Sequence, residues 1–368
     1  MKMKINIKKP SLILDKEKVL RNIEKMVDKV KNSGVKFRPH FKTHQSAKIG
    51  EFFREQGVSS ITVSSVDMAK YFSKHDWKDI TIAFPVNLLQ IDQINDLAKR
   101  TSLNLLVESK ESIHFLSENL KFPVNAWIKI DVGYKRAGIS ANNVDLVVEL
   151  GKEIEESDNL SFSGLLTHSG HSYHATSINQ IKEIYQDTVF KLHKIRDALN
   201  ENGFSSVQIS IGDTPTCSVV ENFSDVDEIR PGNFVFYDVT QMLIGSCTED
   251  DIAIAIACPV VAKHKERNEI VIYGGAVHLS KEFIVREDGT RTYGYIASKA
   301  EKGWGPMIKN SFVSSISQEH GIVKTDEQFF DKIKIGDILM VLPIHSCLAV
   351  NLLREYQTLE GESIKPLE

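Results

Sequence analysis

The feature that most constrains the fold of this chain is a repeated alternation of short β-rich runs with longer amphipathic stretches. Between residues 35 and 230, eight such runs alternate with stretches whose apolar residues recur at helical spacing. This pattern predicts parallel strands joined by helices. Eight strands, with a leading helix at Lys16–Lys31, favour a (β/α)8 TIM barrel over an open doubly wound sheet. The predicted strands are Val35–Arg38, Ser60–Ser64, Asp79–Ala83, Leu103–Glu108, Val124–Asp131, Phe162–His168, Val207–Ile211 and Asp227–Arg230.

The pattern changes after residue 240, where short strand-like runs are joined by turns and no helix of useful length is expected. We therefore predict two domains. Residues 10–245 form the barrel and residues 246–368 form a mostly antiparallel β domain, to which an opening strand within residues 1–9 (Lys4–Ile7) also belongs. The predicted strands of the β domain are Ile252–Cys258, Val260–His264, Glu269–Tyr273, Phe283–Val285, Ile333–Lys334 and Asp337–Val341.

Composition and charge exclude several classes of partner. A hydrophobic content of 42%, a charged content of 26% and a net charge of -4 describe a globular protein with a large core and no basic patch for nucleic acid. No apolar span is long enough to cross a membrane, and the first residues do not resemble a signal peptide. Four dispersed cysteines without a CxxC pair indicate reduced thiols and a cytoplasmic location.

Residues with chemical potential follow the carboxyl ends of the predicted strands, which is the catalytic face of a TIM barrel. Lys42 follows the first strand, between His40 and His44, which could accept its proton. A lysine in this position could form a Schiff base with a carbonyl cofactor. The alternative is a turn rich in basic residues that contacts solvent. Further clusters follow later strands at Asp131–Gly138, Thr167–His174, Gly212–Thr216 and Arg230–Asn233.

Two of these clusters suit a phosphate group. In the loop after strand seven, Gly212 and Thr214 offer backbone N–H groups and a hydroxyl to an anion. After strand eight, Gly232 permits a close approach of the backbone and Asn233 adds an N–H. A simple turn with a helix cap is the alternative, and the carboxylate of Asp213 would oppose a phosphate if it pointed inward.

A third candidate site is His345-Ser346-Cys347. On a strand, residues two apart share a face, so an imidazole and a thiolate at His345 and Cys347 could bind one metal ion. The sulfur ligand favours zinc, with manganese or magnesium as other possibilities. A chance His-x-Cys in a core strand is the alternative. His278 either lines a substrate pocket or caps a turn.

Taken together, these motifs resemble the D-threonine aldolase and eukaryotic-type D-serine dehydratase family, which are fold-type III pyridoxal phosphate enzymes related to alanine racemase. The resemblance covers nearly the whole chain, and its most specific parts are Arg38–His44 and Pro343–Cys347. The more widely shared parts are Asp131–Gly138, Thr167–Gly170, Gly212–Pro215, Arg230–Asn233 and Ser317–Gly321.

The resemblance implies a role for each cofactor residue. Lys42 would carry pyridoxal phosphate, Arg136 would lie near its phenolic oxygen and His168 would flank its ring, which makes these three the expected catalytic residues. Arg230 would meet the pyridine nitrogen and, because an arginine cannot give up its proton, would limit the electron sink. Tyr173 is a weaker cofactor-binding candidate. For Arg136 and Arg230 a structural ion pair is the alternative, and for His168 an ordinary rim histidine.

The resemblance also implies a lyase that acts on D-3-hydroxy amino acids with a divalent metal. His-x-Cys resembles the dehydratases, whereas the aldolases carry His-x-Asp, so we expect a D-serine dehydratase-like reaction that gives a 2-oxo acid and ammonia. Cleavage to glycine and an aldehyde is one alternative. A racemase that uses Tyr293 or Tyr295 is another, and a non-catalytic carrier is disfavoured by the long β domain. The fold implies a homodimer.

Overall fold

The computed structural model describes residues 6–367, which form two compact units. One unit comprises Glu24–Gly232, and the other comprises the chain up to Ile23 together with the chain from Asn233 onward. The division falls within the first helix, α1 (Lys16–Ser33), between Ile23 and Glu24.

The first unit is a closed parallel barrel, as predicted. Its eight strands follow the order β2-β10-β9-β8-β6-β5-β4-β3. The two ends of this order meet through a parallel bridge, in which Phe41 N donates to Thr62 O (2.8 Å) and Thr62 N donates to Pro39 O (2.9 Å). This closure excludes the open sheet. The strands are β2 (Lys36–Phe37), β3 (Ser60–Val63), β4 (Asp79–Pro85), β5 (Ser102–Val107), β6 (Val124–Asp131), β8 (Leu160–Thr167), β9 (Gln208–Ile211) and β10 (Glu228–Ile229), with a short β7 (Ile139–Ser140) beside β6.

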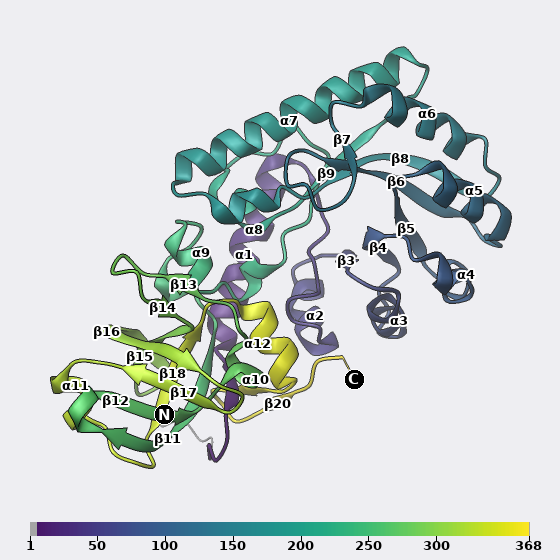
Figure 1. Cartoon of the computed structure of the whole chain (residues 1–368). Coiled ribbons are helices and arrows are strands. Elements are labelled where there is room, and N and C mark those ends of the chain that lie inside the picture. Colours follow the sequence, from purple (N-terminus) through teal and green to yellow (C-terminus); the bar gives the residue numbers. More distant parts are fainter. Residues whose placement is uncertain (1–5, 368) are drawn as a thin grey trace. The chain divides into compact units, whose positions relative to one another are not determined.

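Helices lie outside the strands to which they are joined (Figure 1). Several begin at serines whose hydroxyls accept a backbone N–H of the first turn: Ser65 from Met68 and Ser109 from Ser112. Each then buries an apolar stripe while its charged residues face outward. The helices are α2 (Ala47–Glu55), α3 (Val66–Lys74), η1 (Leu88–Gln90), α4 (Ile91–Ala98), α5 (Lys110–Asn119), α6 (Val144–Glu155), η2 (Gly170–His174), α7 (Ile178–Glu201) and α8 (Thr214–Val219).

The second unit is built on a mostly antiparallel sheet, also as predicted. The strand order is β12-β17-β16-β15-β18-β11-β1-β19-β20, and β12 also pairs with β11, so the first six strands close on themselves. A separate hairpin pairs β13 with β14. The strands are β1 (Ser11–Leu14), β11 (Ile254–His264), β12 (Glu269–Tyr273), β13 (Ile284–Val285), β14 (Arg291–Thr292), β15 (Gly294–Lys299), β16 (Trp304–Ile316), β17 (His320–Lys324), β18 (Ile338–Pro343), β19 (Tyr356–Thr358) and β20 (Ser363–Ile364).

Several details of this unit differ from the prediction. The start of the expected strand Lys4–Ile7 lies outside the described residues, and its end is not a strand. The strand that joins the sheet is β1, which pairs antiparallel with β11. Two predicted strands merge into β11, whose register shifts between Val260 and Ala262. Ile333–Lys334 is not a strand, and α12 (Ser346–Leu353) shows that the expected absence of helices was wrong.

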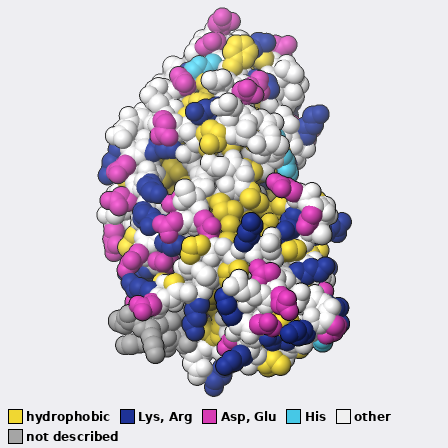
Figure 2. Space-filling view, turned by 90° about the vertical axis from the view of Figure 1, so that its left-hand side faces the viewer, with side chains coloured by type: hydrophobic (Ala, Val, Ile, Leu, Met, Phe, Trp, Pro, Cys, Tyr) yellow, Lys and Arg dark blue, Asp and Glu magenta, His cyan; other side chains and the backbone are white. Residues whose placement is uncertain are grey.

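Shorter helices complete the second unit, and the surface carries mixed charges. Figure 2 shows Lys, Arg, Asp and Glu side chains interspersed over the face in view, without a large patch of one sign. Within residues 6–367, no helix combines the length and apolar character needed to cross a bilayer. The shorter helices are η3 (Asn233–Val235), α9 (Val239–Leu243), η4 (Glu249–Asp251), η5 (Lys265–Arg267), α10 (Ala276–Leu279) and α11 (Glu327–Lys332).

Candidate active site

Cationic side chains gather around two neutral histidines at the carboxyl rim of the barrel. Burial lowers the pKa of His40 well below its usual value, and the charges of Lys42, Arg230 and Arg136 lower it further. Burial and then the charge of Lys42 likewise lower the pKa of His168, with a smaller contribution from Arg136. Both histidines are therefore influenced by Lys42 and Arg136, and His40 is also influenced by Arg230 and His168. The structure thus brings together Lys42, Arg136, His168 and Arg230, which the sequence placed at four different strand ends.

His168 is held in one tautomer. Its Nδ1 is bonded to the carbonyl oxygen of Gly212, which can only accept, so Nδ1 carries the hydrogen and Nε2 has a free lone pair at neutral pH. Tyr134 lies edge-on to the ring, with centroids 5.8 Å apart, and Arg136 stacks over Tyr134 at 5.0 Å. His168 is therefore an acceptor at Nε2 and not a proton donor.

The loop after β9 suits an anion, because its one acidic side chain is directed into the protein. Asp213 caps α8, and its Oδ1 accepts from Thr216 N and from Ser172 Oγ, both at 2.8 Å. Burial raises the pKa of Asp213 in spite of these hydrogen bonds. Thr214 Oγ1 is buried without a hydrogen-bond partner among the described residues, while its backbone N–H donates to Tyr173 Oη (3.3 Å).

The two glycines of the predicted phosphate site are required by protein neighbours. A Cβ at Gly212 would lie 2.8 Å from the Cβ of Arg230, and one at Gly232 would lie 2.9 Å from the carbonyl oxygen of His40. In both loops, therefore, the backbone packs directly against residues at the end of a neighbouring strand. An unpartnered buried hydroxyl at Thr214 and a rim rich in cations fit the phosphate and phenolate groups of pyridoxal phosphate.

Arg230 also belongs to a chain of buried polar groups inside the barrel. Its Nε donates to Ser210 Oγ (2.7 Å), which donates to Glu228 Oε1 (2.7 Å). Glu228 Oε2 accepts from Arg38 Nε (2.6 Å), and Arg38 also binds Asp79. Burial lowers the pKa of Arg230 to about 10, against the effect of Glu228, so the guanidinium stays charged at neutral pH. Arg230 thus takes part in a buried structural network, as the alternative interpretation expects, and it also lies at the rim of the barrel.

His44 does not join this centre. It is fully buried, with its ring centroid 4.3 Å from that of Phe41 and 5.6 Å from that of Phe53. Burial lowers the pKa of His44 to about 3. The expectation that both histidines beside Lys42 could accept its proton is therefore wrong for His44, because its side chain packs into an aromatic cluster beneath the turn.

A second lysine that the sequence motifs did not indicate, Lys129, lies inside the barrel. Lys129 is 6% exposed and donates to the carbonyl oxygen of Ile130 (3.1 Å). Burial, together with the charges of Arg230 and Arg136, lowers its pKa to about 7. A charged residue within the apolar strand Val124–Asp131 was the signal that could have identified it.

Replacing Lys129 with methionine should stabilise the apoprotein in a pH-dependent manner. The folded-state pKa lies below the unfolded value, so the unfolded chain binds the extra proton between pH 7 and 10, and stability rises with pH across that window. This rise in the free energy of unfolding is about 1.4 kcal/mol per pH unit, and Lys129→Met should remove it. The variant should exceed the wild type in stability most at or below pH 7. Urea unfolding between pH 7.5 and 9.5 measures the pH dependence of both proteins. An unchanged slope in Lys129→Met, or the same change in the exposed Lys99→Met, would contradict the assignment.

In the second unit, His345 and Cys347 lie at the start of a helix and not on a strand. β18 ends at Pro343, His345 is the N-cap of α12 and Cys347 lies in its first turn. The strand prediction was wrong because distant side chains bind the backbone here. Asp238 Oδ2 accepts from Ser346 N (3.0 Å), and Thr240 Oγ1 donates to Ile344 O (2.8 Å).

His345 and Cys347 are both of residue types that can ligate a metal ion. An imidazole and a thiol suit zinc, and two protein ligands leave positions for water or substrate. Within residues 6–367, no group of three or more His, Cys, Asp or Glu side chains is arranged to hold a metal ion. Any metal at His345 and Cys347 would therefore have an open coordination sphere, which is typical of catalytic sites.

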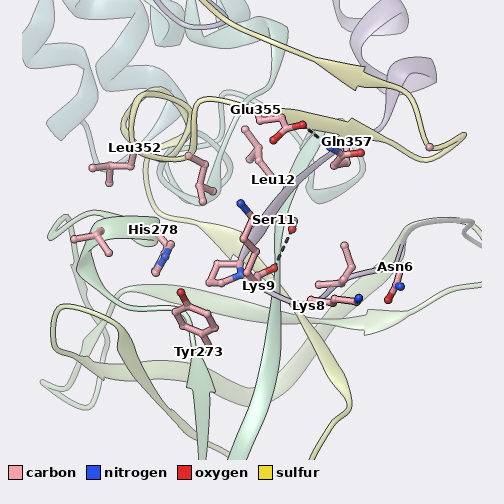
Figure 3. A pocket seen from close by; sticks show the side chains of 15 residues that line it. Asn6, Lys8, Lys9, Ser11, Leu12, Tyr273, His278, Leu352, Glu355 and Gln357 are labelled. Atoms are coloured by element: carbon pink, nitrogen blue, oxygen red, sulfur yellow. Dashed lines mark hydrogen bonds between the residues drawn. The ribbon is translucent and has the colours of Figure 1, made fainter.

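A hollow of about 820 Å³ lies in the second unit, beside β1 and α10 (Figure 3). Lys8, Lys9, Tyr273 and His278 are among the residues that line it. His278 Nδ1 accepts from Gly275 N (3.2 Å), and its Nε2 lies 3.6 Å from Glu319. His278 thus both caps the turn before α10 and lines a hollow.

Two family models match the chain. The model of the alanine racemase N-terminal domain covers residues 14–239, more than half of the sequence. The chain belongs to this family. A second model, described as "Putative serine dehydratase domain", covers residues 253–359, which include His345 and Cys347. Relatives of this alanine racemase-like chain include dehydratases and aldolases, so the relationship predicted from the motifs is confirmed.

Three curated relatives match over nearly their full length. D-threo-3-hydroxyaspartate dehydratase of Delftia sp. (strain HT23) is 25% identical, with 96% of this chain and 94% of that protein covered. D-serine dehydratase of Dictyostelium discoideum is 28% identical, with 97% and 95% covered. 3-Hydroxy-D-aspartate aldolase of Paracoccus denitrificans (strain Pd 1222) is 24% identical, with 92% and 85% covered.

The fold matches that of a solved relative. The structure of the Delftia dehydratase superimposes with a TM-score of 0.92 at 23% identity, covering 100% of this chain and 98% of that one. Further structures of that enzyme include a cysteine-to-alanine mutant in the metal-free form and a histidine-to-alanine mutant. The two substituted positions lie two residues apart, the same spacing and order as His345 and Cys347.

Proposed function

We propose that this chain is a lyase that uses pyridoxal phosphate and a divalent metal to convert D-3-hydroxy amino acids into 2-oxo acids and ammonia. The observation that carries the proposal is the presence in one chain of a lysine-centred cationic rim on a closed barrel and a His-x-Cys pair within the serine dehydratase domain. The predicted division assigns the cofactor to residues 10–245 and the metal to residues 246–368.

Residues of the barrel rim would hold the cofactor. Lys42 would bind it covalently through its amine, Thr214 would donate its unpartnered hydroxyl to the phosphate, and Arg136 and Arg230 would supply positive charge. Tyr173, Gly212, Gly232 and Asn233 complete the proposed set. When bound, pyridoxal phosphate supplies an electron sink for negative charge at the α-carbon of an amino acid.

The chain's own groups then define the proton chemistry. The Lys42 amine is the group proposed to move a proton at the α-carbon, because burial and cationic neighbours lower the pKa of His40 and His168 and make both imidazoles weak bases. His168 Nε2 can orient a donor but cannot supply a proton at neutral pH. The cations favour anionic groups, including the substrate carboxylate, and together with burial they keep both imidazoles neutral.

His345 and Cys347 would hold the metal. The spacing matches that of the two mutated positions in the Delftia enzyme, one of whose mutants is metal-free. Zinc is favoured by the thiolate, and a divalent metal would supply a Lewis acid for an oxygen of the substrate. We further propose a homodimer in the cytoplasm; light scattering on the purified protein measures the oligomeric state.

Aldol cleavage is the second candidate, because the Paracoccus relative is a 3-hydroxy-D-aspartate aldolase. Product analysis with D-serine, D-threonine and D-threo-3-hydroxyaspartate separates the two reactions. A 2-oxo acid with ammonia supports the dehydratase. Glycine with an aldehyde assigns the chain to the aldolases, and epimerisation alone assigns it to the racemases.

Removal of the metal should abolish 2-oxo acid formation. We expect chelation, His345→Ala or Cys347→Ala each to reduce kcat/KM roughly 10²-fold or more, because the leaving hydroxyl loses its Lewis acid. Zinc should restore the chelated wild type but neither variant. His264→Ala and Cys247→Ser, in the same unit, are matched controls that should retain activity. Full activity in metal-free protein would refute the metal requirement.

A further inference from the structure

The segment after β10 is bonded repeatedly to the segment that carries His345 and Cys347. Residues 233–241 contain η3 and the start of α9, and five hydrogen bonds of 2.8–3.7 Å between described residues join them to residues 344–347. These partners lie more than 100 positions apart in the sequence. This segment belongs to the same unit as the proposed metal ligands.

Asp238 is the centre of these contacts. Its side chain is fully buried, and its Oδ1 accepts from Gln241 N (3.0 Å). Its Oδ2 accepts from Asn233 Nδ2 (2.7 Å) and Ser346 N (3.0 Å). A buried carboxylate is tolerated only when it is well bonded, and these three N–H donors fix its position. His345 Nδ1 lies 3.6 Å from the same Oδ2, so Nε2 is the nitrogen that this ring can direct to a metal.

Asn233 makes a related contact with the sulfur. Its Nδ2 donates to Asp238 Oδ2, lies 2.9 Å from Ser346 Oγ and 3.7 Å from Cys347 Sγ. The amide orientation follows from chemistry, because the opposite orientation would place its oxygen against the carboxylate of Asp238. One N–H of this amide is used by Asp238, and the other is directed towards Ser346 Oγ and Cys347 Sγ, so Asn233 helps to fix the position of the sulfur.

We propose that Asp238 and Asn233 are positioning residues of the metal site. Asp238 orients His345 so that Nε2 is its metal ligand, and Asn233 orients the sulfur of Cys347. Groups that hydrogen-bond to metal-ligating side chains typically change the metal affinity about 10–100-fold. The inference rests on the proposed metal site, and it gives the segment after β10 a role in metal binding that the sequence motifs did not indicate.

Zinc affinity and the cobalt spectrum of the full-length protein test this proposal. We expect Asp238→Asn to weaken Zn²⁺ binding about 10–100-fold in competition with a chelator of known affinity. Asn233→Ala should weaken it less and should shift the sulfur-to-cobalt charge-transfer band of the Co²⁺-loaded protein. Asp251→Asn is the matched control. Asp251 is also a buried capping carboxylate of this unit, with Thr248 N at 2.9 Å, but it is bonded at η4. The Zn²⁺ affinity and the Co²⁺ spectrum of Asp251→Asn should equal those of the wild type.

Thermal unfolding of the metal-free variants separates positioning from folding. A purely structural role would lower the melting temperature of Asp238→Asn and Asp251→Asn alike and leave the cobalt spectrum of folded protein unchanged. If both Asp238→Asn and Asn233→Ala bind Zn²⁺ with an affinity within twofold of the wild type, this inference is overturned, but the proposed metal site is not. If wild type binds no Zn²⁺, or His345→Ala binds it equally well, the metal site itself is refuted and the inference with it. Should Asp238→Asn not fold, the spectrum of Asn233→Ala decides.

Discussion

Replacement of Lys42 by alanine is expected to reduce turnover roughly 10⁴-fold or more. The side chain has two proposed tasks, binding the cofactor and moving the α-proton. The neighbouring histidines cannot bind the cofactor covalently in its place, and they are weak bases, because burial and cationic neighbours lower the pKa of His40 and His168. The variant should also lose the visible absorbance of the lysine-bound cofactor. Steady-state kinetics and an absorbance spectrum of purified protein measure both effects.

Lys48→Ala is the matched control for this experiment. Lys48 lies six positions further along, in α2, and its side chain is exposed. We expect this control to retain both the activity and the absorbance of the wild type. A Lys42→Ala variant that still turns over at a tenth of the wild-type rate would remove Lys42 from its role and, with it, the proposed cofactor site.

Replacement of Arg38 by methionine is expected to destabilise the protein by about 3–5 kcal/mol. Arg38 is 2% exposed and lies between Asp79 and Glu228. Its loss would leave the buried carboxylate of Glu228 without this cation. Urea unfolding at pH 7 measures the change. Lys110→Met, which removes exposed ion pairs with Glu149 and Glu153, should cost less than about 1 kcal/mol.

The effect of Arg38→Met should also depend on pH. Burial alone would raise the pKa of Asp79, but the hydrogen bonds and charges of Arg38 and Lys36 outweigh it and lower the pKa to about 2. A carboxyl group with a depressed pKa stabilises the fold above its unfolded pKa near 4, and this contribution is lost as the pH falls towards 2. The difference between wild type and Arg38→Met should therefore narrow between pH 4 and pH 2. A constant difference across this range would show that Asp79 is not the partner.

The barrel and its rim were predictable from the sequence because both depend on local periodicity. The predicted strand Val124–Asp131 matches the structure residue for residue, and parallel strands necessarily bring their carboxyl ends together. Lys42, His168 and Arg230 could thus be assigned to one rim without coordinates.

Features that depend on long-range bonding were not predictable. The His-x-Cys pair was placed on a strand because the apolar run of β18 leads directly to it. The partners that bind the backbone after this strand, Asp238 and Thr240, lie 108 and 104 positions away in the sequence. β1 was missed because four residues are too few for a clear period. Lys129 was missed because its apolar neighbours Ile128 and Ile130 dominate the pattern.

The barrel closes next to its proposed catalytic lysine, and this has a thermodynamic consequence. The bridge between His40 and Thr62 closes the barrel, because it joins the two ends of the strand order. Lys42 lies two residues after His40. In the proposed site, a cofactor held by Lys42 and by the loops after β9 and β10 would bind the closed barrel in preference to an opened one, so cofactor binding and barrel closure would be linked equilibria. Amide hydrogen exchange at Phe41 and Thr62 should slow on loading, which makes these two N–H groups reporters of how firmly the enzyme holds its cofactor.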